Sequence, residues 1–329
     1  MNQTQTGTPP FTRVANDLRA IVVGMGGISG TMLKFLGQQA WYDTAAVVDI
    51  RPQALEAAKH TLELDDDALF TDLDRALAQA DADAVIINTP SELHFAQASA
   101  ALRAGKHVLV AKPVTNDFQQ AVELVELAES VGRSLCVGQQ MRYNRHYSTV
   151  RGYVSGGALG SVEMMNFLNA KPRHEAKNLA KMDQPALYEM SCHHFDSILS
   201  IFPDHVPAWI MVDGFRPSWS VYVGPCSING VIRLTAKATG KATANPAAKG
   251  PLHLLYHGGF SSQADLYELR LEGSEGALRC RGLHMSNDTM DYEVSPRDGA
   301  TPVMMPSYSL PILSRMKMTF FHSSTSRDA

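Results

Sequence analysis

The chain has 329 residues, of which 45% are hydrophobic and 19% charged, a length and composition that predict about two soluble globular domains. Its 29 basic and 33 acidic residues are well mixed and leave a formal net charge of -4, so no basic stripe favours nucleic acid as a partner. No apolar run approaches the roughly 20 residues that cross a bilayer, which argues against a membrane protein. The four cysteines are widely separated, include no C-x-x-C pair and indicate neither a disulfide framework nor a zinc ribbon. We therefore expect a protein of the reducing cytoplasm.

Residues 1–138 alternate between short apolar runs and helical patterns. The predicted strands are 20–23, 45–48, 84–87, 107–110 and 134–137, and the predicted helices include 52–62, 91–104 and 116–131. Such alternation predicts parallel strands joined by crossover helices. We expect a flexible tail over residues 1–17, which lacks the order of a secretory signal, and a doubly wound α/β domain over residues 18–138.

The first predicted strand runs into a glycine-rich turn, Gly24-Met-Gly26-Gly27-Ile28-Ser29-Gly30. It fits G-x-G-x-x-G, with Ser29 as the small residue at the third glycine position. The first glycine permits a tight turn, the second lets the backbone approach a pyrophosphate, and the third position needs only a small side chain for helix packing. The helix that begins at Ile28 would present its free N–H groups to the phosphates. The alternative is a strand-to-helix turn that binds no ligand, so we predict dinucleotide contacts at Gly24, Gly26, Gly27 and Ile28 on the motif together with its context.

A carboxylate, Asp49, ends the second predicted strand. In a dinucleotide fold this position can accept hydrogen bonds from both hydroxyls of the adenosine ribose, which favours NAD over NADP. Arg51 follows two residues later, and a guanidinium there can instead hold a 2′-phosphate. We therefore predict NAD as the cofactor and keep NADP open. A solvated carboxylate at a strand end is the other interpretation of Asp49.

The pattern changes after the first domain to longer and more polar strand candidates at 161–168, 209–213, 231–236 and 267–271. One helix, over residues 188–202, interrupts them with an apolar stripe. We expect residues 139–329 to form an α+β domain whose predominantly antiparallel open sheet has one solvated face. Residues 236–250, rich in Ala, Lys, Gly and Thr, are expected to form an exposed loop.

Three further segments complete a pattern that spans both domains: Asn88-Thr89-Pro90 with His94, Ala104 to Pro113, and Cys192-His193-His194-Phe195-Asp196. On these motifs, residues 18–310 resemble the Gfo/Idh/MocA family of NAD(P)-dependent sugar and inositol dehydrogenases. The resemblance implies a Rossmann domain followed by an α/β domain whose open sheet often supports a homo-oligomer, a dimer or a tetramer. It also extends the expected cofactor contacts, to Asn88, Thr89, Pro90, His94, Lys112, Pro113 and Gln140.

The resemblance places a catalytic lysine at Lys112, after the fifth strand, where the family has Glu-Lys-Pro and its lysine contacts the reacting hydroxyl or carbonyl. Lys112 and Pro113 match this motif, whereas Ala111 replaces the glutamate, so we expect Lys112 to be less firmly positioned than in the family. A solvated surface lysine is the alternative interpretation.

The family's downstream motif falls on Glu189, His193 and Asp196. Offsets of four and three residues place all three on one helix face, so Glu189 can orient the imidazole of His193. His193 is therefore the predicted general acid/base, set against a packed or surface histidine with no chemical role. His194 faces elsewhere and is expected to be structural. Adjacent helical side chains point about 100° apart, so we predict no metal site at Cys192, His193 and His194.

The predicted substrate pocket draws on two further segments. Arg142 and Tyr143, after Gln140, match the family's strand exit, which lines the cleft, and their hydrogen-bonding groups suit a polyol. Lys171, Arg173 and His174 follow the first strand of the second domain. A polar interdomain linker and ordinary loop charges are the alternatives for these two segments.

Three function classes follow from this interpretation. The first is a dehydrogenase or reductase of a sugar, inositol or related polyol, in which Lys112, Glu189 and His193 contact substrate. The second is glycoside cleavage through transient oxidation by retained NAD, and the third is a non-catalytic dinucleotide sensor. The family usually ends with a helix that returns to the nucleotide domain, and we expect it to be missing from the segment after residue 307.

Overall fold

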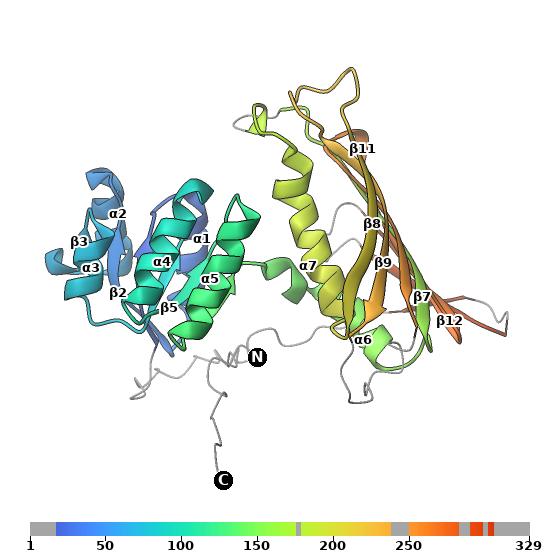
Figure 1. Cartoon of the computed structure of the whole chain (residues 1–329), viewed down its shortest axis with the longest axis horizontal. Coiled ribbons are helices and arrows are strands. Elements are labelled where there is room, and N and C mark those ends of the chain that lie inside the picture. The colour runs from blue at the N-terminus through green and yellow to red at the C-terminus, as the bar shows by residue number, and fades with distance from the viewer. Residues whose placement is uncertain (1–17, 176–178, 238–249, 283–289, 299–301, 306–329) are drawn as a thin grey trace, which may run out of the picture. The chain divides into compact units, whose positions relative to one another are not determined.

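The computed structural model describes residues 18–175, 179–237, 250–282, 290–298 and 302–305. The chain divides into two compact units, Met1–Gly138 (unit 1) and Gln139–Ala329 (unit 2), both drawn in Figure 1. The predicted N-terminal tail, most of the predicted loop at 236–250 and the predicted missing C-terminal helix lie outside the described residues. In the part of the chain that is described, no helix has the length and apolarity that a membrane span requires.

Unit 1 is built on a six-stranded sheet in the order β3-β2-β1-β4-β5-β6, in which the described pairs are all parallel. The strands are β1 (Leu18–Val23), β2 (Tyr42–Val48), β3 (Leu69–Phe70), β4 (Ala84–Ile87), β5 (His107–Val110) and β6 (Leu135–Val137). The helices are α1 (Gly27–Leu36), α2 (Pro52–Leu62), α3 (Leu73–Gln79), α4 (His94–Arg103) and α5 (Phe118–Ser130), with short 3-10 turns at Asp66–Ala68 and Ser91–Leu93. This sheet confirms the predicted doubly wound fold.

Both faces of this sheet are covered by helices. Ile21 and Val23 of β1 pack in a cluster with α3, α4 and α5, whereas Ala20 and Val22 pack in a cluster with Leu33 of α1 and with α2. Strands buried on both faces become continuous apolar runs, as these sequences are. The carboxyl ends of the parallel strands are therefore left as the edge at which a ligand can be held.

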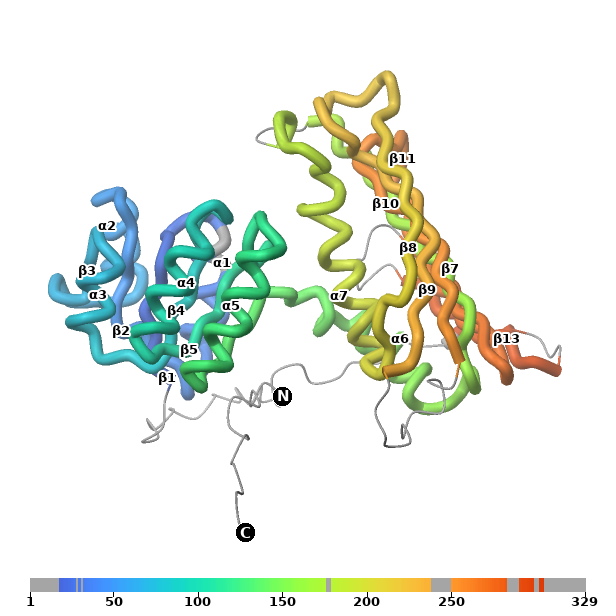
Figure 2. The backbone as a smooth tube through the Cα atoms, viewed as in Figure 1, coloured from blue at the N-terminus to red at the C-terminus, as the bar shows by residue number. Residues whose placement is uncertain are grey.

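Unit 2 is an eight-stranded mixed sheet in the order β14-β13-β12-β11-β7-β10-β9-β8. Its strands are β7 (Val162–Pro172), β8 (His205–Phe215), β9 (Ser227–Ala236), β10 (Leu252–Gly259), β11 (Ser261–Gly273), β12 (Gly276–Gly282), β13 (Asp291–Pro296) and β14 (Val303–Met305). Strand β10 runs parallel to β7, and the other described pairs are antiparallel. Strands β8 and β9 form one edge of the sheet, and their course can be followed in Figure 2. The sheet confirms the predicted, predominantly antiparallel second domain.

The helices of unit 2 differ from the prediction in two ways. The predicted helix 188–202 begins as a π-helical turn, Leu187–Ser191, and continues as α7, Cys192–Ile201. A second helix, α6 (Arg145–Ser155), follows a 3-10 turn at Gln140–Tyr143 and was not predicted. Both helices contribute to one apolar core with the sheet, which contains Tyr147 and Val150 of α6 and Ile198 and Ile201 of α7.

The opposite face of this sheet is exposed, as predicted, but carries large apolar side chains. Met211 of β8 is 59% exposed, Leu255 of β10 is 55% exposed and Leu266 of β11 is 48% exposed. With polar neighbours such as Asn166 and Glu268 they line a shallow cavity of about 680 Å³ across the strands. Apolar side chains gathered on one exposed face are typical of surfaces that other molecules contact.

Candidate functional site

The glycine turn of unit 1 has the geometry that its motif predicts. Gly24 adopts φ +84°, and a Cβ there would lie 2.9 Å from Cγ2 of Thr89 and 3.0 Å from the Asn88 backbone, so the turn requires glycine. A Cβ on Gly26 or Gly27 would meet no protein atom within 4 Å. The backbone at the start of α1 therefore borders open space, where a ligand can approach it closely.

The start of α1 is suited to an anion. Its N-cap is Gly26, which provides no side-chain cap, and the first turn contains no acidic residue. The first N–H groups and the positive end of the helix dipole are thus left for a ligand's phosphates. The side chain of Ile28 lies outside the described residues, while its backbone belongs to α1.

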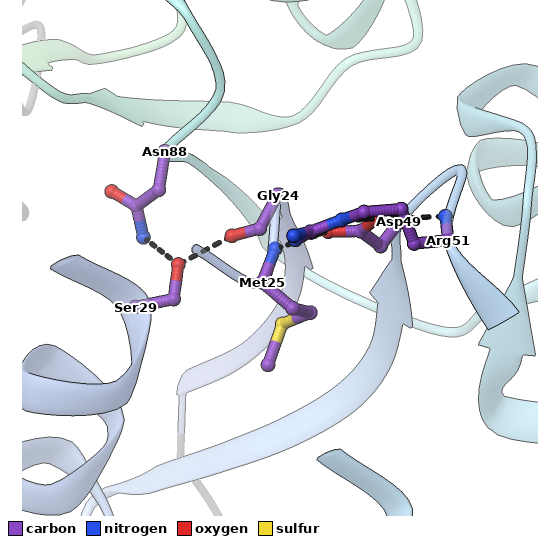
Figure 3. A network of polar contacts seen from close by, with 6 residues as sticks. All are labelled: Gly24, Met25, Ser29, Asp49, Arg51 and Asn88. Carbon is purple, nitrogen blue, oxygen red and sulfur yellow. Dashed lines mark hydrogen bonds and ion pairs between the residues drawn. The ribbon is translucent and has the colours of Figure 1, made fainter. Parts of the chain in front are cut away.

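Ser29 takes the third position of the motif and is completely buried. Its hydroxyl donates a hydrogen bond to the carbonyl oxygen of Gly24 and accepts one from Nδ2 of Asn88, at 3.0 Å (Figure 3). A glycine would be smaller still and would form neither bond. Ser29 therefore joins the turn after β1 to the loop after β4 and holds two predicted cofactor segments together.

Asp49, which directly follows β2, is 7% exposed, and both of its carboxylate oxygens accept hydrogen bonds (Figure 3). Its Oδ2 accepts from the Met25 backbone N–H at 2.7 Å and from Nη2 of Arg51 at 2.9 Å, while its Oδ1 accepts from the Arg51 backbone N–H and Nε, both at 2.9 Å. The side-chain hydrogen bonds from Arg51 are the main cause that lowers the pKa of Asp49 to about 2. The Arg51 side chain is 58% exposed, so it can leave this carboxylate without breaking the core.

The loops after β4 and β5 lie beside this turn. The Asn88 N–H donates to the Val23 carbonyl, and the Ala111 N–H donates to the Ile87 carbonyl. His94, which is 1% exposed, lies between the carbonyl oxygens of Thr89 and Pro113, with ring nitrogens 2.9 and 2.8 Å away. The buried His94 ring thus connects the loop after β4 to the loop after β5. Its contact with the cofactor stays a prediction.

In this way the structure gathers most of the predicted cofactor residues at the carboxyl edge of one sheet. These are Gly24, Gly26, Gly27, Asp49, Arg51, Asn88, Thr89, Pro90, His94, Lys112 and Pro113. Ala111 directly follows β5, and its backbone N–H bond to the Ile87 carbonyl continues the pairing with β4 up to Lys112. Gln140 belongs to unit 2, where it begins the 3-10 turn before α6.

Unit 2 holds its own group of predicted residues around the start of α7. His193 is 9% exposed, and the adjacent His194 is completely buried. Burial chiefly, and then the charges of Lys171 and His193, lower the pKa of His194. Burial and the neighbouring charge of Arg173 lower the pKa of Lys171. The end of β7 thus brings the charge of Lys171 near His194, and the charge of Arg173 near Lys171.

His194 is held by a chain of hydrogen bonds that sequence reasoning missed. Nδ2 of Asn169 donates to Nε2 of His194 at 2.9 Å, and Nδ1 of His194 contacts the Tyr256 hydroxyl at 2.8 Å. That hydroxyl donates to Oγ of Ser191 at 2.6 Å, and Ser191 donates to the Ala186 carbonyl. These bonds require a neutral His194 with its proton on Nδ1, in agreement with its lowered pKa. They join the π turn and α7 to strands β7 and β10.

The other predicted substrate residues have mixed surroundings. Arg142 forms a bidentate ion pair with Asp196, Nε to Oδ2 at 2.8 Å and Nη2 to Oδ1 at 2.6 Å, so the third residue of the Glu189 motif binds this guanidinium. Arg173 lies 4.7 Å from the centre of the Phe260 ring. Tyr143 and His174 are exposed, and Glu189 is half-buried on the π turn. In the described residues, no group of three potential metal ligands comes together.

Comparisons with known proteins agree with this geometry. Residues 18–139 match the family described as "Oxidoreductase family, NAD-binding Rossmann fold". That family is Gfo/Idh/MocA, and the match covers the nucleotide-binding fold of unit 1. Its relatives include "Uncharacterized oxidoreductase YhhX" of Escherichia coli K12, 36% identical over 140 residues that cover 41% of this chain and 40% of the relative. They also include "Inositol 2-dehydrogenase" of Rhizobium meliloti, 27% identical over 53% of this chain and 52% of the relative.

The chain therefore spans about half, or less, of the length of these curated relatives. A solved structure, an inositol dehydrogenase homolog complexed with NAD⁺ from Azotobacter vinelandii, superimposes with a TM-score of 0.73 at 18% identity. That superposition covers 91% of this chain and 79% of the other. At this identity the likeness shows a shared fold.

Proposed function

We propose that this protein is an NAD(P)-dependent oxidoreductase that transfers a hydride between nicotinamide and a CH–OH carbon of a sugar, inositol or related polyol. The observation that carries the proposal is the start of α1, which no side chain caps and where a Cβ on Gly26 or Gly27 would meet no protein atom within 4 Å. Such a helix start can bind an anion, and the glycine motif puts it where a dinucleotide pyrophosphate would bind. The relative named inositol 2-dehydrogenase and the NAD⁺ in the Azotobacter structure support the cofactor and the substrate class.

NAD is the proposed cofactor, with Asp49 as the ribose ligand. Both carboxylate oxygens of Asp49 are occupied by Arg51, so the ribose hydroxyls would replace the exposed guanidinium rather than add to it. Arg51 would then be available for a 2′-phosphate, but the ionised Asp49 beside it opposes a second negative charge. We therefore expect NAD to bind more tightly than NADP.

The proposed chemistry divides between Lys112 and His193. His193 takes the proton of the substrate hydroxyl, Glu189 stabilises the resulting imidazolium, and Lys112 stabilises the negative charge that develops on the oxygen. Bound NAD would accept the hydride from the same carbon. Lys112 belongs to unit 1 and His193 to unit 2.

The test is a substrate screen joined to a matched pair of variants. Sugars, sugar acids and inositols are assayed with NAD and with NADP at the absorbance of the reduced nicotinamide. His193→Ala should lower turnover by about 10²- to 10⁴-fold, while the Kd for NAD stays within about twofold. His253→Ala, an exposed histidine on β10, is the control and should leave turnover unchanged. Normal turnover in His193→Ala would remove the assignment.

We also propose that the exposed apolar face of unit 2 forms a homo-oligomer interface. Met164, Met211, Leu255 and Leu266 present apolar surface on neighbouring strands, and burial of such a face against a second copy removes it from water. Light scattering should give the mass of a dimer or tetramer for the wild type and a smaller mass for Met211→Asp. A monomeric wild type at micromolar concentration would refute this proposal.

A further inference from the structure

A cavity of about 530 Å³ lies in unit 2 where α7 ends and β8 begins. Its lining includes four basic residues and a hydroxyl: Arg142, Arg151, Ser200, His205 and Lys237. We call it the basic cavity. Asp204, which directly precedes β8, does not contribute to the lining. This concentration of positive charge contrasts with the net charge of -4 of the whole chain.

Arg151 on α6 is fixed in place by neutral partners. Its Nη1 donates to the Arg142 carbonyl at 3.1 Å and to Oγ of Ser200 at 3.0 Å, and its Nη2 donates to Oγ of Ser148 at 3.2 Å. Among the described residues, no carboxylate forms an ion pair with this guanidinium. Burial and the charge of Arg142 lower the pKa of Arg151, as expected for a cation that lacks a counter-ion.

The remaining charges of the cavity leave it positive. Asp196 neutralises Arg142 through the bidentate pair, whereas the Lys237 ammonium donates to the Pro203 carbonyl at 2.7 Å and has two further donors. Two cations, those of Arg151 and Lys237, are therefore in excess. A dianionic group is the ligand that such a pair recognises best, because each N–H bond to it is charge-assisted.

His205 adds a polar group without a partner. It is 2% exposed, its Nε2 lies 3.0 Å from the Gly250 carbonyl and so carries a proton, and its Nδ1 has no hydrogen-bond partner in the described part of the chain. A buried ring nitrogen without a partner is costly unless a ligand or water supplies one. A protonated phosphate oxygen or a sugar hydroxyl can donate to it.

We propose that the basic cavity binds a phosphate group. Ser200 follows His193 by seven residues on α7, so it lies two turns along the same helix face, roughly 10 Å away. A phosphorylated sugar could therefore present its carbinol carbon near His193 and its phosphate to Arg151 and Lys237. The assignment of a phosphorylated sugar as substrate rests on the proposed function, whereas the binding of free phosphate to the cavity does not.

The test is calorimetric titration of the full-length protein, without cofactor, against inorganic phosphate, glucose 6-phosphate and glucose. Phosphate should bind, and Lys237→Gln should weaken it about tenfold, the effect of one lost charge-assisted hydrogen bond. Arg233→Gln, an exposed cation on β9, makes the same charge change away from the cavity and should bind phosphate like the wild type. Arg151→Lys keeps the charge but loses the fork of donors and should also weaken phosphate binding.

The two sources of the phosphate group give different titrations. Glucose 6-phosphate that binds at least tenfold more tightly than inorganic phosphate assigns the cavity to a phosphorylated substrate, and equal affinities assign it to the free ion. Absence of phosphate binding, or equal losses in Lys237→Gln and Arg233→Gln, would overturn the proposal. Because no cofactor is present, either result is independent of whether the protein oxidises a polyol.

Discussion

Replacement of Gly26 by alanine tests the role assigned to the start of α1. Gly26 has φ -79° and ψ -173°, extended backbone that alanine adopts, and the added Cβ would meet no protein atom within 4 Å. The loss of an N-cap glycine should therefore cost only about 0.5–1 kcal/mol of folding free energy. The methyl group instead occupies the space through which a pyrophosphate would approach the backbone. Loss of one charge-assisted hydrogen bond, about 1.5–3 kcal/mol, raises the Kd for NAD roughly 10- to 100-fold.

Gly30→Ala is the matched control, since it makes the same chemical change inside α1. An alanine there also meets no protein atom within 4 Å, and replacement of a helical glycine should stabilise the fold by about 0.5–1 kcal/mol. Isothermal titration with NAD measures both variants, and circular dichroism confirms that they are folded. Folded Gly26→Ala that binds NAD within twofold of the wild type would refute the anion site. Equal weakening in both variants would show that the loss does not depend on the start of the helix.

Three further predictions concern stability. Gly24→Ala combines a positive φ with a Cβ 2.9 Å from Thr89 and should lower the unfolding free energy by about 2–4 kcal/mol, measured by urea unfolding; a loss below about 1 kcal/mol contradicts this geometry. At pH 7, Asp49→Asn should lower the unfolding free energy by about 1–2 kcal/mol. This loss is smaller than the shift of the Asp49 pKa from 3.8 to about 2 would give, because solvent screens the exposed Arg51 side chain. The difference in unfolding free energy between variant and wild type should shrink as the pH falls from 4 towards 2. Burial lowers the pKa of His146 from 6.5 to about 3, so between pH 7.5 and pH 5 the unfolded chain takes up a proton that the folded chain does not. The unfolding free energy of the wild type should therefore fall by about 2 kcal/mol over that range through this residue. Thermal melts of His146→Gln should show a flatter dependence of stability on pH, and an unchanged slope would exclude His146 as the cause.

The fold of unit 1 could be predicted because its signals are local. Strands buried on both faces are short apolar runs, and β1, β2, β4, β5 and β6 all coincide with predicted runs. Strand β3 was missed because it has two residues, too few for any periodicity. Helix α6 was missed because its buried side chains include His146, Ser148 and Thr149, so its apolar stripe is interrupted by polar residues.

The candidate site was predictable to the extent that sequence neighbours define it. Gly24, Ser29 and Asp49 follow their strands at spacings that the dinucleotide motif fixes, and the structure brings them to one sheet edge. The two hydrogen bonds from the Arg51 side chain to Asp49 were not predictable, because a separation of two residues does not reveal which rotamer Arg51 adopts. The basic cavity was missed for a different reason: Arg151 and Lys237 are 86 positions apart, and only the packing of α6 beside the end of α7 brings them to one surface.

The adjacent histidines His193 and His194 show how a packed core can orient a neighbouring side chain. The sequence predicted a structural role for His194, and its hydrogen bonds to Asn169 and Tyr256 fix its ring between two strands. Because a helix turns about 100° per residue, fixing one ring also fixes the direction in which the next one leaves the backbone. The π turn before α7 is tied to the same chain of bonds through Ser191, so the backbone on both sides of His193 is restrained. The neutral, buried His194 therefore gives His193 a defined orientation at low entropic cost, as the proposed general-base role of His193 requires.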